Sequence, residues 1–491
     1  MNVFDWYSMK RYQSFNQNVD LALLANQYLH WSSVSRGPVM SRSCFAAITL
    51  AAGSGARMKS VIPKVMHPIA GQPMIAHLLG ALQPLTPAAT VVVVGPQMRD
   101  VTRVVAPAET VVQDPPLGTG DAVRVALRVI RDRLAPGGDI DEVLVLFGDT
   151  PLLRAETLSR FLAEHRTASA AICVSGMRPA DPAAYGRFVL GPDGGLERIV
   201  EAADATPEEC AIGIVNGGIM AIDAHHVADL VDALDSDNAK GEFYLSEIVR
   251  IARRKGLGCR AIELPVGELI GINTRAELAE AEALMQSRLR RAAMDAGVTL
   301  VAPETVFLCY DTRLGRDVVV EPNVNFGPGV TVEEGARIRS FSHLEGATVG
   351  AGAIVGPFAR LRPGAVLEEE VHVGNFVEVK AARLGAGVKA NHLSYIGDAE
   401  VGVRSNIGAG TITCNYDGFN KFRTTIGADA FIGSNTALVA PVSIGAGAIV
   451  AAGSVITNDV PANALSIARG KQVDKPGRAT EIRERLRGKS N

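Results

Sequence analysis

Two hydrophobic patterns divide the chain. Between about residues 45 and 270, short runs that are apolar at every position alternate with segments that are apolar at helical spacing. The runs include 46–50, 90–94 and 143–147, and the segment 121–133 has the helical spacing. Strands buried on both faces and separated by helices are typical of a parallel sheet covered by helices. This half is therefore predicted to be an α/β sandwich with a mostly parallel sheet.

From about residue 315 the apolar positions recur every sixth residue. A helix repeats every 3.6 residues and a half-exposed strand every two, so a period of six fits neither. Three such hexapeptides form one triangular coil of a parallel β-helix, and the aliphatic side chains stack inside it. The pattern predicts this fold for two series, Val349, Val355, Leu361, Leu367, Val373 and Val379, then Ile426, Ile432, Leu438, Ile444, Val450 and Ile456.

The segment 275–297 separates these two patterns. It places Leu278, Leu284, Met285 and Leu289 in a charged, Ala-rich background, which predicts one long helix that ends at Gly297. We interpret this helix as the arm that joins two domains.

The first residues match neither pattern. We expect a disordered leader over residues 1–43, or a start assigned too far upstream, with Met40 as the true start. The predicted organisation is a leader (1–43), an α/β domain (44–273), a helical linker (274–297), a β-helix domain (298–470) and a flexible tail (471–491).

Composition narrows the class of protein. A chain of 491 residues is too long for one ordinary core, and its net charge of −3 provides no broad basic surface for nucleic acid. The six cysteines are scattered without a C-x-x-C pair, which suits a reducing cytosol better than a disulfide framework or a zinc site. No apolar run reaches the roughly 18 residues of a membrane span. We therefore expect a cytoplasmic protein without nucleic-acid or membrane partners.

A glycine-rich turn follows the first predicted strand. Glycine lets the backbone approach a ligand closely, and N–H groups in a turn can hold phosphate oxygens. Two cations after the turn, Arg57 and Lys64, add fixed positive charge. An ordinary turn remains the alternative for the glycines alone. The segment reads Leu50, Ala51, Ala52, Gly53, Ser54, Gly55, Ala56, Arg57 and Met58, with Pro63 and Lys64 after it.

A second predicted strand end carries a carboxylate. The apolar run 143–147 ends in Gly148 and Asp149. Ligands of open α/β sheets bind beyond the carboxyl ends of the strands, where both Gly53 and Asp149 fall. Mg²⁺ prefers hard oxygen ligands and needs only one or two from the protein. Asp149 is therefore a candidate magnesium ligand, and an aspartate in a strand-end turn is the alternative.

These motifs resemble those of known enzymes. L-A-A-G-x-G-x-R-M followed by P-K is similar to the signature of nucleotidyltransferases that join a sugar 1-phosphate to a nucleoside triphosphate, with Ala56 where threonine is usual. An α/β domain followed by hexapeptide repeats resembles, over residues 46–470, the GlmU family of bifunctional N-acetylglucosamine-1-phosphate uridylyltransferases and glucosamine-1-phosphate N-acetyltransferases. The resemblance implies a Rossmann-like first domain, a left-handed β-helix and a homotrimer with acetyl sites between subunits.

The resemblance also implies roles in the first domain. Gln113 could pair with an imide edge as both donor and acceptor. Glu201 and Asn216 would otherwise be ordinary solvated residues, and Gly217 stands where the family more often has threonine, which predicts looser sugar positioning. The implied roles are catalysis for Arg57 and Lys64; nucleotide contact for Leu50, Ala51, Ala52, Gly53 and Lys64; uracil contact for Gln113, Gly118 and Thr119; Mg²⁺ ligation for Asp149 and Asn273; and sugar contact for Gly186, Glu201 and Asn216.

The second candidate site centres on His392. Acetylation of an amine needs a base, and an imidazole that titrates near neutrality suits that task, although a structural histidine is the alternative. Arg362 and Lys380 are cations among small residues and suit a sugar phosphate. A polar break in the repeat at 408–418 predicts a functional loop. The resemblance implies glucosamine 1-phosphate contacts at Arg362, Lys380, Tyr395 and Asn406, and an acetyl-CoA groove at Ala409, Asn415, Tyr416, Ser434, Ala452 and Arg469.

The sequence thus predicts a bifunctional enzyme. Its C-terminal half would acetylate glucosamine 1-phosphate from acetyl-CoA. Its N-terminal half would then use UTP and Mg²⁺ to make UDP-N-acetylglucosamine for cell-wall and lipopolysaccharide precursors. One alternative is a single-activity nucleotidyltransferase with a regulatory β-helix, as in ADP-glucose pyrophosphorylases, against which His392 argues. The other is a non-enzymatic scaffold, as in some translation-factor subunits, against which Lys64 and Asp149 argue.

Overall fold

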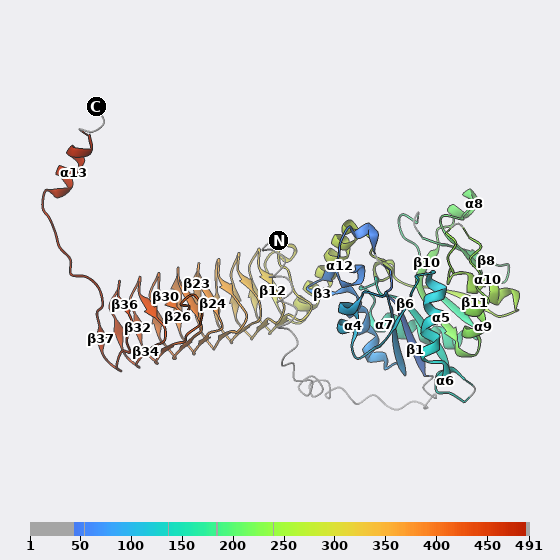
Figure 1. Ribbon diagram of the computed structural model, residues 1–491, viewed down its shortest axis with the longest axis horizontal. Coiled ribbons are helices and arrows are strands. Elements are labelled where there is room, and N and C mark those ends of the chain that lie inside the picture. Colours follow the sequence, from blue (N-terminus) through green and yellow to red (C-terminus); the bar gives the residue numbers. More distant parts are fainter. Residues whose placement is uncertain (1–43, 54, 136, 183–184, 239, 488–491) are drawn as a thin grey trace. The chain divides into compact units, whose positions relative to one another are not determined.

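The computed structural model describes residues 44–53, 55–135, 137–182, 185–238 and 240–487. The chain divides into two units, Met1–Cys44 and Phe45–Asn491. The predicted leader, residues 1–43, lies outside the described residues. In the second unit an α/β region comes first and a stack of short strands follows it (Figure 1).

A nine-stranded sheet forms the centre of the α/β region. Its strands are β1 (Phe45–Leu50), β4 (Ala89–Val94), β5 (Glu109–Val112), β6 (Glu142–Phe147), β7 (Ile172–Met177), β8 (Arg187–Leu190), β9 (Leu196–Val200), β10 (Val215–Asp223) and β11 (Cys259–Glu263). The order is β11-β7-β10-β6-β1-β4-β5, and β8 and β9 attach beside β10. β6, β1, β4 and β5 run parallel, whereas β10 is antiparallel to β6 and β7. The predicted mostly parallel sheet is confirmed.

Helices cover both faces of this sheet because alternate residues of a strand point to opposite sides. Ala46 and Ile48 of β1 pack in the core cluster that contains side chains of α5, α9 and α10. Phe45 and Ala47 pack in the cluster of α3 and α7. The helices are α3 (Met74–Leu82), α4 (Arg99–Val105), α5 (Thr119–Val129), α6 (Arg131–Leu134), α7 (Ala155–Thr167), α8 (Pro207–Cys210), α9 (Ala224–Asp232), α10 (Glu247–Arg254) and α11 (Val266–Leu269).

Short elements lie around the first strand and the start of the second region. They are the 3-10 turns η2 (Ala56–Met58), η3 (Lys64–Met66), η4 (Gln83–Leu85) and η5 (Pro303–Thr305), and the small hairpin β2 (Pro68–Ile69) and β3 (Gln72–Pro73). η2 and η3 contain the two cations that follow the glycine-rich turn.

The predicted long helix is α12 (Arg275–Asp295). It begins with a capping box, in which Thr274 and Glu277 each bond the other's backbone N–H. Met285 lies in a core cluster with Ile69 and Leu152 of the α/β region. Further along the helix, Leu289 packs against both this cluster and the β-helix core. The helix is thus anchored to both regions, and its first turn is held close to the sheet.

The hexapeptide segment forms three parallel sheets, one on each face of a prism. The first face has β12 (Thr299–Leu300), β14 (Val319–Val320), β17 (Arg337–Ile338), β20 (Ile354–Val355), β23 (His372–Asn375), β26 (Lys389–His392), β29 (Asn406–Ile407), β32 (Phe431–Ile432), β35 (Ile449–Val450) and β37 (Leu465–Ser466). The second face has β15 (Asn325–Phe326), β18 (His343–Leu344), β21 (Arg360–Leu361), β24 (Glu378–Lys380), β27 (Tyr395–Gly397), β30 (Ile412–Cys414), β33 (Ala437–Val439) and β36 (Val455–Ile456). The third face has β13 (Arg313–Leu314), β16 (Thr331–Val332), β19 (Ala347–Val349), β22 (Ala365–Leu367), β25 (Arg383–Leu384), β28 (Ala399–Val401), β31 (Thr424–Ile426) and β34 (Val442–Ile444).

The predicted sixth-position residues fill the interior of this prism. Val355, Leu361 and Leu367 come from the three faces of one coil, and all are at most 1% exposed. Both predicted series belong to one continuous buried cluster. This confirms the left-handed β-helix of hexapeptide repeats.

The predicted break at 408–418 is wrong in its position. The coil continues through β30. The inserted segment runs from 415 to 423, and β31 then resumes the third face. Thr413 occupies an inward position and is 2% exposed. Its hydroxyl accepts a hydrogen bond from Gly397 N at 2.8 Å, so a polar side chain is tolerated where the repeat has an aliphatic one.

The predicted tail contains one helix, α13 (Arg478–Arg487), whose residues are all exposed. Among the described residues, no helix has both the length and the apolar composition that a membrane span requires.

Candidate functional site

The two cations after the first strand meet two oxygens from distant parts of the chain. Lys64 Nζ forms an ion pair with Asp149 and donates a hydrogen bond to Asn273 Oδ1 at 3.0 Å. Arg57 donates to the same amide oxygen at 2.9 Å. Asn273 Nδ2 donates to Gly271 O at 3.3 Å, which directs its oxygen toward the cations. We call these four residues, Arg57, Lys64, Asp149 and Asn273, the phosphate cluster.

Backbone contacts hold the two oxygens of this cluster together. Ile272 N donates to Asp149 O at 3.0 Å, and this bond joins the end of β6 to the segment before α12. Glu277 Oε2 accepts a bond from Asn273 N at 2.6 Å and also takes part in the capping box of α12. The start of the long helix therefore fixes Asn273 beside Asp149.

The glycine-rich turn allows the close approach of Lys64. Gly55 has φ 69°, and a Cβ there would lie 2.6 Å from Lys64 Cβ, so a larger residue would displace the lysine. Ala51 N donates to Val93 O at 2.8 Å and extends the β1–β4 ladder into the turn. A Cβ on Gly53 would meet nothing within 4 Å, so the backbone here is open to a ligand.

The phosphate cluster has the donor set of a magnesium site with few protein ligands. The oxygens of Asp149 and Asn273 converge on one point, the ammonium of Lys64. Both are hard oxygens, which Mg²⁺ prefers, and Mg²⁺ commonly takes one or two protein ligands beside phosphates and waters. No group of three or more His, Cys, Asp or Glu side chains suited to a metal occurs in the part of the chain that the structure describes.

Gln113 presents one hydrogen-bonding atom to a ligand, which corrects the prediction that it offers both. Its amide nitrogen donates to Gly118 O at 3.0 Å and to Asp121 Oδ2 at 2.9 Å. Only Oε1 remains for a base. The hydroxyl of Thr119 accepts a bond from Leu245 N at 2.9 Å, so this side chain secures the loop.

The three predicted sugar residues lie together. Asn216 N donates to Gly186 O at 2.8 Å, and a Cβ on Gly186 would lie 3.6 Å from Glu201 Oε1. Ser246 donates to Glu201 Oε1 at 2.8 Å. Tyr185 directly precedes Gly186. Burial raises the pKa of Tyr185, and the charges of Glu277 and Asp149 raise it further. The predicted sugar residues are therefore within electrostatic reach of the phosphate cluster.

Packing explains the glycine after Asn216. A Cβ on Gly217 would lie 2.6 Å from Leu269 Cδ1 and 2.8 Å from Ser175 Oγ. A threonine would require Leu269 to move. Looser positioning of the sugar at this point stays a prediction.

His392 lies at the end of β26, in register with Asn375 of β23. Its Nδ1 lies 2.8 Å from Asn375 Oδ1, and its side chain is exposed. With the amide oxygen facing the ring, Nδ1 is the nitrogen that carries the hydrogen in the neutral imidazole, and the lone pair is then on Nε2. The imidazole is thus oriented as a base.

A network of charged residues lies on the adjoining second face. Arg362 donates to Glu378 at 2.8 Å, and Lys380 donates to Asp398 at 3.4 Å. Asn415 donates to the carboxylate of Asp398 and, at 3.4 Å, to the hydroxyl of Tyr395. The predicted residues Arg362, Lys380, Tyr395 and Asn415 are therefore brought together. Asn406, by contrast, begins β29 on the first face beside Lys389, and the Tyr416 hydroxyl donates to Gly418 within its own loop.

Sequence reasoning missed three members of this network, Glu378, Asp398 and Lys421. The interaction between the side chains of Lys380 and Lys421 lowers the pKa of Lys421 and raises that of Lys380. Arg362, Lys380 and Asp398 follow one another at intervals of 18 positions, the length of three hexapeptides, and this spacing could have identified Asp398. Lys421 lies in the inserted segment, where no periodicity applies.

A line of small residues continues from His392 along one corner of the prism. Ala409, Ser434 and Ala452 occupy this corner in the next three coils. In each of these coils, the residue directly after the small residue donates its backbone N–H to the carbonyl of the line's member one coil earlier. The three distances are 3.3, 2.7 and 2.8 Å. Arg469 then donates to Ala452 O at 2.6 Å. We call this line, with His392, the corner column.

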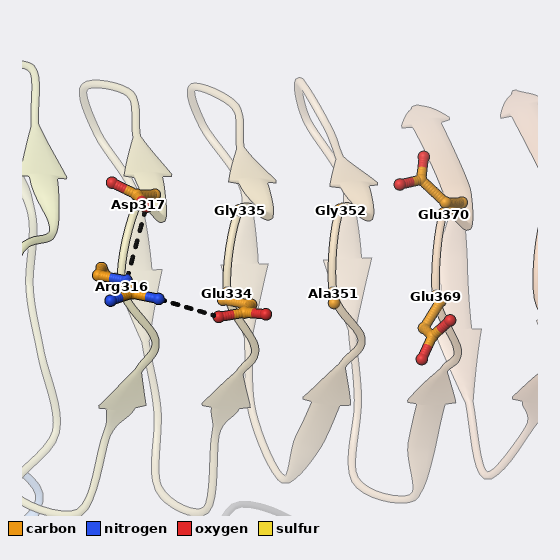
Figure 2. Close-up of a pocket in the computed structure, with 8 residues that line it drawn as sticks. All are labelled: Arg316, Asp317, Glu334, Gly335, Ala351, Gly352, Glu369 and Glu370. Atoms are coloured by element: carbon orange, nitrogen blue, oxygen red, sulfur yellow. Dashed lines mark ion pairs between the residues drawn. The ribbon is translucent and has the colours of Figure 1, made fainter.

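A hollow on another corner contains none of the predicted residues. Figure 2 shows its side chains on successive coils, where Arg316 lies 3.8 Å from Glu334. Glu369 and Glu370 project from a single coil, two coils beyond Glu334, without a cation drawn beside them (Figure 2). Because nucleotides and sugar phosphates are anions, this acidic surface does not suit them.

Comparison with known proteins covers both halves. Residues 47–192 match the MobA-like NTP transferase domain, and residues 423–458 match the bacterial transferase hexapeptide repeats. The chain is 53% identical over 445 residues to "Bifunctional protein GlmU" of Paramagnetospirillum magneticum, covering 90% of this chain and 98% of that protein. Proteins of the same name from Rhodospirillum rubrum and Acidiphilium cryptum are 55% and 57% identical over 444 and 437 residues, again covering 98% of each relative and 90% and 89% of this chain.

Proposed function

This chain belongs to the GlmU family of bifunctional proteins, and from that premise we propose which of its residues carry each activity. It is a bifunctional transferase that acts on small molecules, with uridylyltransferase and N-acetyltransferase activities that together make UDP-N-acetylglucosamine. We assign uridylyl transfer to residues 44–273 and acetyl transfer to residues 298–470, with 274–297 as the linker.

The phosphate cluster is our assignment for uridylyl transfer. In this reaction a phosphate oxygen of N-acetylglucosamine 1-phosphate attacks the α-phosphorus of UTP, and the bond to pyrophosphate breaks. The acceptor is already an anion, so no general base is needed and catalysis consists mainly of positioning and charge neutralisation. Arg57 and Lys64 supply the positive charge. The convergence of both cations on Asn273, with Asp149 against Lys64, is the observation that carries this assignment.

Asp149 and Asn273 are our proposed ligands for Mg²⁺. When bound, the ion neutralises charge on the phosphates of UTP. Lys64, which occupies the point between the two oxygens here, would then be free to donate to a phosphate oxygen. The backbone of Leu50, Ala51, Ala52 and Gly53 lines the same site.

We assign the remaining nucleotide and sugar contacts to two groups of residues that lie together in the first domain. Gln113, Gly118 and Thr119 surround the uracil base. Gly186, Glu201 and Asn216 hold the sugar, and the hydrogen bond between Asn216 and Gly186 supports their common role.

His392 is our proposed general base for acetyl transfer. The amine of glucosamine 1-phosphate attacks the thioester carbonyl of acetyl-CoA, its proton passes to Nε2 of His392, and coenzyme A leaves as the thiol after protonation. The contact of Nδ1 with Asn375 supports this role because it favours the neutral tautomer in which Nε2 is the nitrogen that can accept a proton. Asn375 is a positioning residue in this reaction.

Three cations suit the phosphate of the acceptor. Arg362, Lys380 and Lys421 gather on the second face, and Tyr395 lies beside them in register with Glu378. A phosphate dianion among these cations would favour the protonated form of Lys421. Asn406 completes the proposed acceptor contacts.

The corner column suits the extended arm of acetyl-CoA. Coils are about 4.8 Å apart, so the column from His392 to Arg469 spans about 19 Å over four steps. Small side chains at Ala409, Ser434 and Ala452 leave room along it. Asn415 and Tyr416 border it from the inserted loop, and Arg469 at its end can meet a phosphate of coenzyme A.

We propose a homotrimer in which neighbouring β-helices cover part of this surface. The last coils expose Phe431, Ile449 and Leu465 on the first face at 49%, 48% and 64%, whereas the third face presents Glu400 and Ser443. Apolar patches on otherwise polar proteins commonly mark protein interfaces.

The corner between the first and second faces supports the same packing. Phe341, Phe358 and Phe376 stack on successive coils with ring centroids 4.9 and 5.3 Å apart, and all are about half exposed. Leu393, beside His392, is 62% exposed on the following coil. Gel filtration with light scattering should give the mass of three chains, and a stable, fully active monomer would contradict the trimer.

We place the enzyme in the cytoplasm. None of the cysteines in the described part of the chain forms a disulfide bond, which suits a reducing compartment. Both co-substrates, UTP and acetyl-CoA, would be available to the enzyme in that compartment. The product feeds the synthesis of cell-wall precursors.

One coupled assay tests the proposed function. The purified chain is incubated with glucosamine 1-phosphate, acetyl-CoA, UTP and Mg²⁺, and free thiol and pyrophosphate are followed separately. We expect both to be released, with pyrophosphate release dependent on acetyl-CoA. Pyrophosphate released only from supplied N-acetylglucosamine 1-phosphate, with no thiol, would show that the β-helix site is inactive.

A further inference from the structure

We infer that Asp121 is a positioning residue that makes the base site selective for uracil over cytosine. It does so by fixing the amide orientation of Gln113. This inference rests on the proposed function, because it concerns the base of the nucleotide that the first site uses.

The environment of Gln113 determines which end of its amide faces a ligand. The two groups beside its amide nitrogen, Gly118 O and Asp121 Oδ2, are acceptors only. An amide oxygen turned toward them would meet two oxygens without a hydrogen between them. Gln113 is 3% exposed, so water cannot compensate for such a loss. The NH₂ group must therefore face inward, and Oε1 must face the base.

An amide oxygen selects a base by requiring a donor. Uracil carries a hydrogen on N3 and can donate it to Oε1. Cytosine has a lone pair at N3, which would face the lone pairs of Oε1. A site built around a buried hydrogen bond strongly rejects an analogue that cannot form it. A fixed Gln113 orientation is thus sufficient to favour UTP over CTP.

Asp121 is itself held in place. Its Oδ1 lies 3.5 Å from Arg124, and the Asp121 side chain is 13% exposed. Arg124 donates to Val231 O at 2.9 Å and lies 4.8 Å from the ring centroid of Phe243. The carboxylate therefore keeps one oxygen for Gln113 and the other for Arg124.

The loop that carries Gly118 depends on the same region. Phe243 N donates to Leu117 O and Phe243 O accepts from Gly120 N, both at 2.8 Å. A Cβ on Gly118 would lie 2.7 Å from Phe243 O, so only glycine fits there. Gly118 O alone would still hold the Gln113 amide in the absence of Asp121, but with one hydrogen bond where there are now two.

The test compares UTP with CTP in three variants. Asp121→Ala should lower the ratio of kcat/KM for UTP to that for CTP by about tenfold, mainly through KM, because the Gln113 amide can then rotate at the loss of one hydrogen bond. Asp121→Asn should keep the ratio within about threefold of the wild type, since the asparagine oxygen still accepts from Gln113. Pyrophosphate release with N-acetylglucosamine 1-phosphate is the assay.

Asp100→Ala is the matched control. Asp100 also lies in the first turn of a helix, α4, and pairs with an arginine three residues later, at 3.1 Å. It should leave both the ratio and the activity unchanged, which separates the Gln113 contact from any effect of a lost carboxylate on helix stability.

The outcomes distinguish this inference from the proposed function. A wild-type enzyme that neither binds nor uses UTP would overturn the proposed function and this inference with it. A wild type that prefers UTP, with the same preference in Asp121→Ala, would overturn the role of Asp121 alone. An Asp121→Asn variant as impaired in selectivity as Asp121→Ala would show that the charge, and not the hydrogen bond to Gln113, is what matters.

Discussion

The phosphate cluster and the corner column are assembled in opposite ways. Arg57 and Asn273 lie 216 positions apart and meet because β1, β6 and the start of α12 converge at the carboxyl edge of the sheet. Members of the corner column come from successive coils, and backbone hydrogen bonds at this corner join the coils of His392, Ala409, Ser434 and Ala452. The geometry of the first site therefore depends on the topology of the whole sheet, and that of the second depends on the spacing of one repeat. Changes at one site should leave the other intact.

His392→Ala should produce the largest difference between the two activities. Loss of the general base should reduce acetyl transfer by about 10²–10⁴-fold, and uridylyl transfer should not change. Thiol release and pyrophosphate release are measured on the same preparation, each with its own substrate supplied. His343→Ala, which removes an exposed histidine from another coil, is the control. Equal loss of both activities would contradict separate sites.

Asp149→Asn should produce the opposite result with a somewhat smaller effect. Removal of the charge that faces Lys64 and the proposed Mg²⁺ should lower uridylyl transfer by about 10²–10³-fold and spare acetyl transfer. The Mg²⁺ concentration that gives half-maximal uridylyl transfer should also rise. Asp132→Asn, at an exposed position of α6, serves as the control. If the magnesium requirement is unchanged, Asp149 is not a ligand.

Lys421→Met tests whether the inserted loop contributes to the acceptor site. The KM for glucosamine 1-phosphate should rise about tenfold with little change in kcat, because a charged contact to phosphate is lost. Lys471→Met, in the tail, should have no effect.

The same lysine predicts a pH dependence. Because Lys380 lowers the pKa of Lys421, the wild-type KM should rise as the pH increases through that lowered pKa and the amine loses its charge. The rise should be absent in Lys421→Met. A variant that keeps the wild-type pH profile would exclude Lys421 as its source.

Asn375→Ala should give the smallest effect. Loss of one hydrogen bond to the imidazole should lower kcat for acetyl transfer by about fivefold and leave KM unchanged, since Asn375 orients His392 and does not touch the substrate in our assignment. Asn325→Ala, an exposed asparagine on β15, is the control. A large rise in KM would mean that Asn375 binds the substrate directly.

Some parts of the molecule could be predicted from local pattern alone. The period of six places Val355 and Leu361 inside a coil without any knowledge of tertiary structure, because each coil repeats the same constraint. The limits of the insertion could not be found in this way. Thr413 looks like a break in the pattern, and only its bonds to Gly397 show that it belongs to the coil.

The candidate sites were predictable to different degrees. Gly53 and Asp149 stand just beyond strand ends, where the pattern of buried runs already directs attention. Lys421 and Asp121 lack any such signal. Their roles depend on which neighbours the fold supplies, namely the amine of Lys380 and the amide of Gln113.

The sequence by itself determined the two architectures, the long helix between them, and the residue types that suit phosphate and amine chemistry. These follow from hydrophobic periodicity and from short motifs, which act over a few residues. Only the tertiary structure decided that Asn273 reaches the cations of the first strand, that the Gln113 amide has one orientation, and that Asp398 joins Lys380 to Asn415. Hydrogen bonds are short and directional, so such contacts depend on how distant segments meet, and no spacing along the chain specifies that.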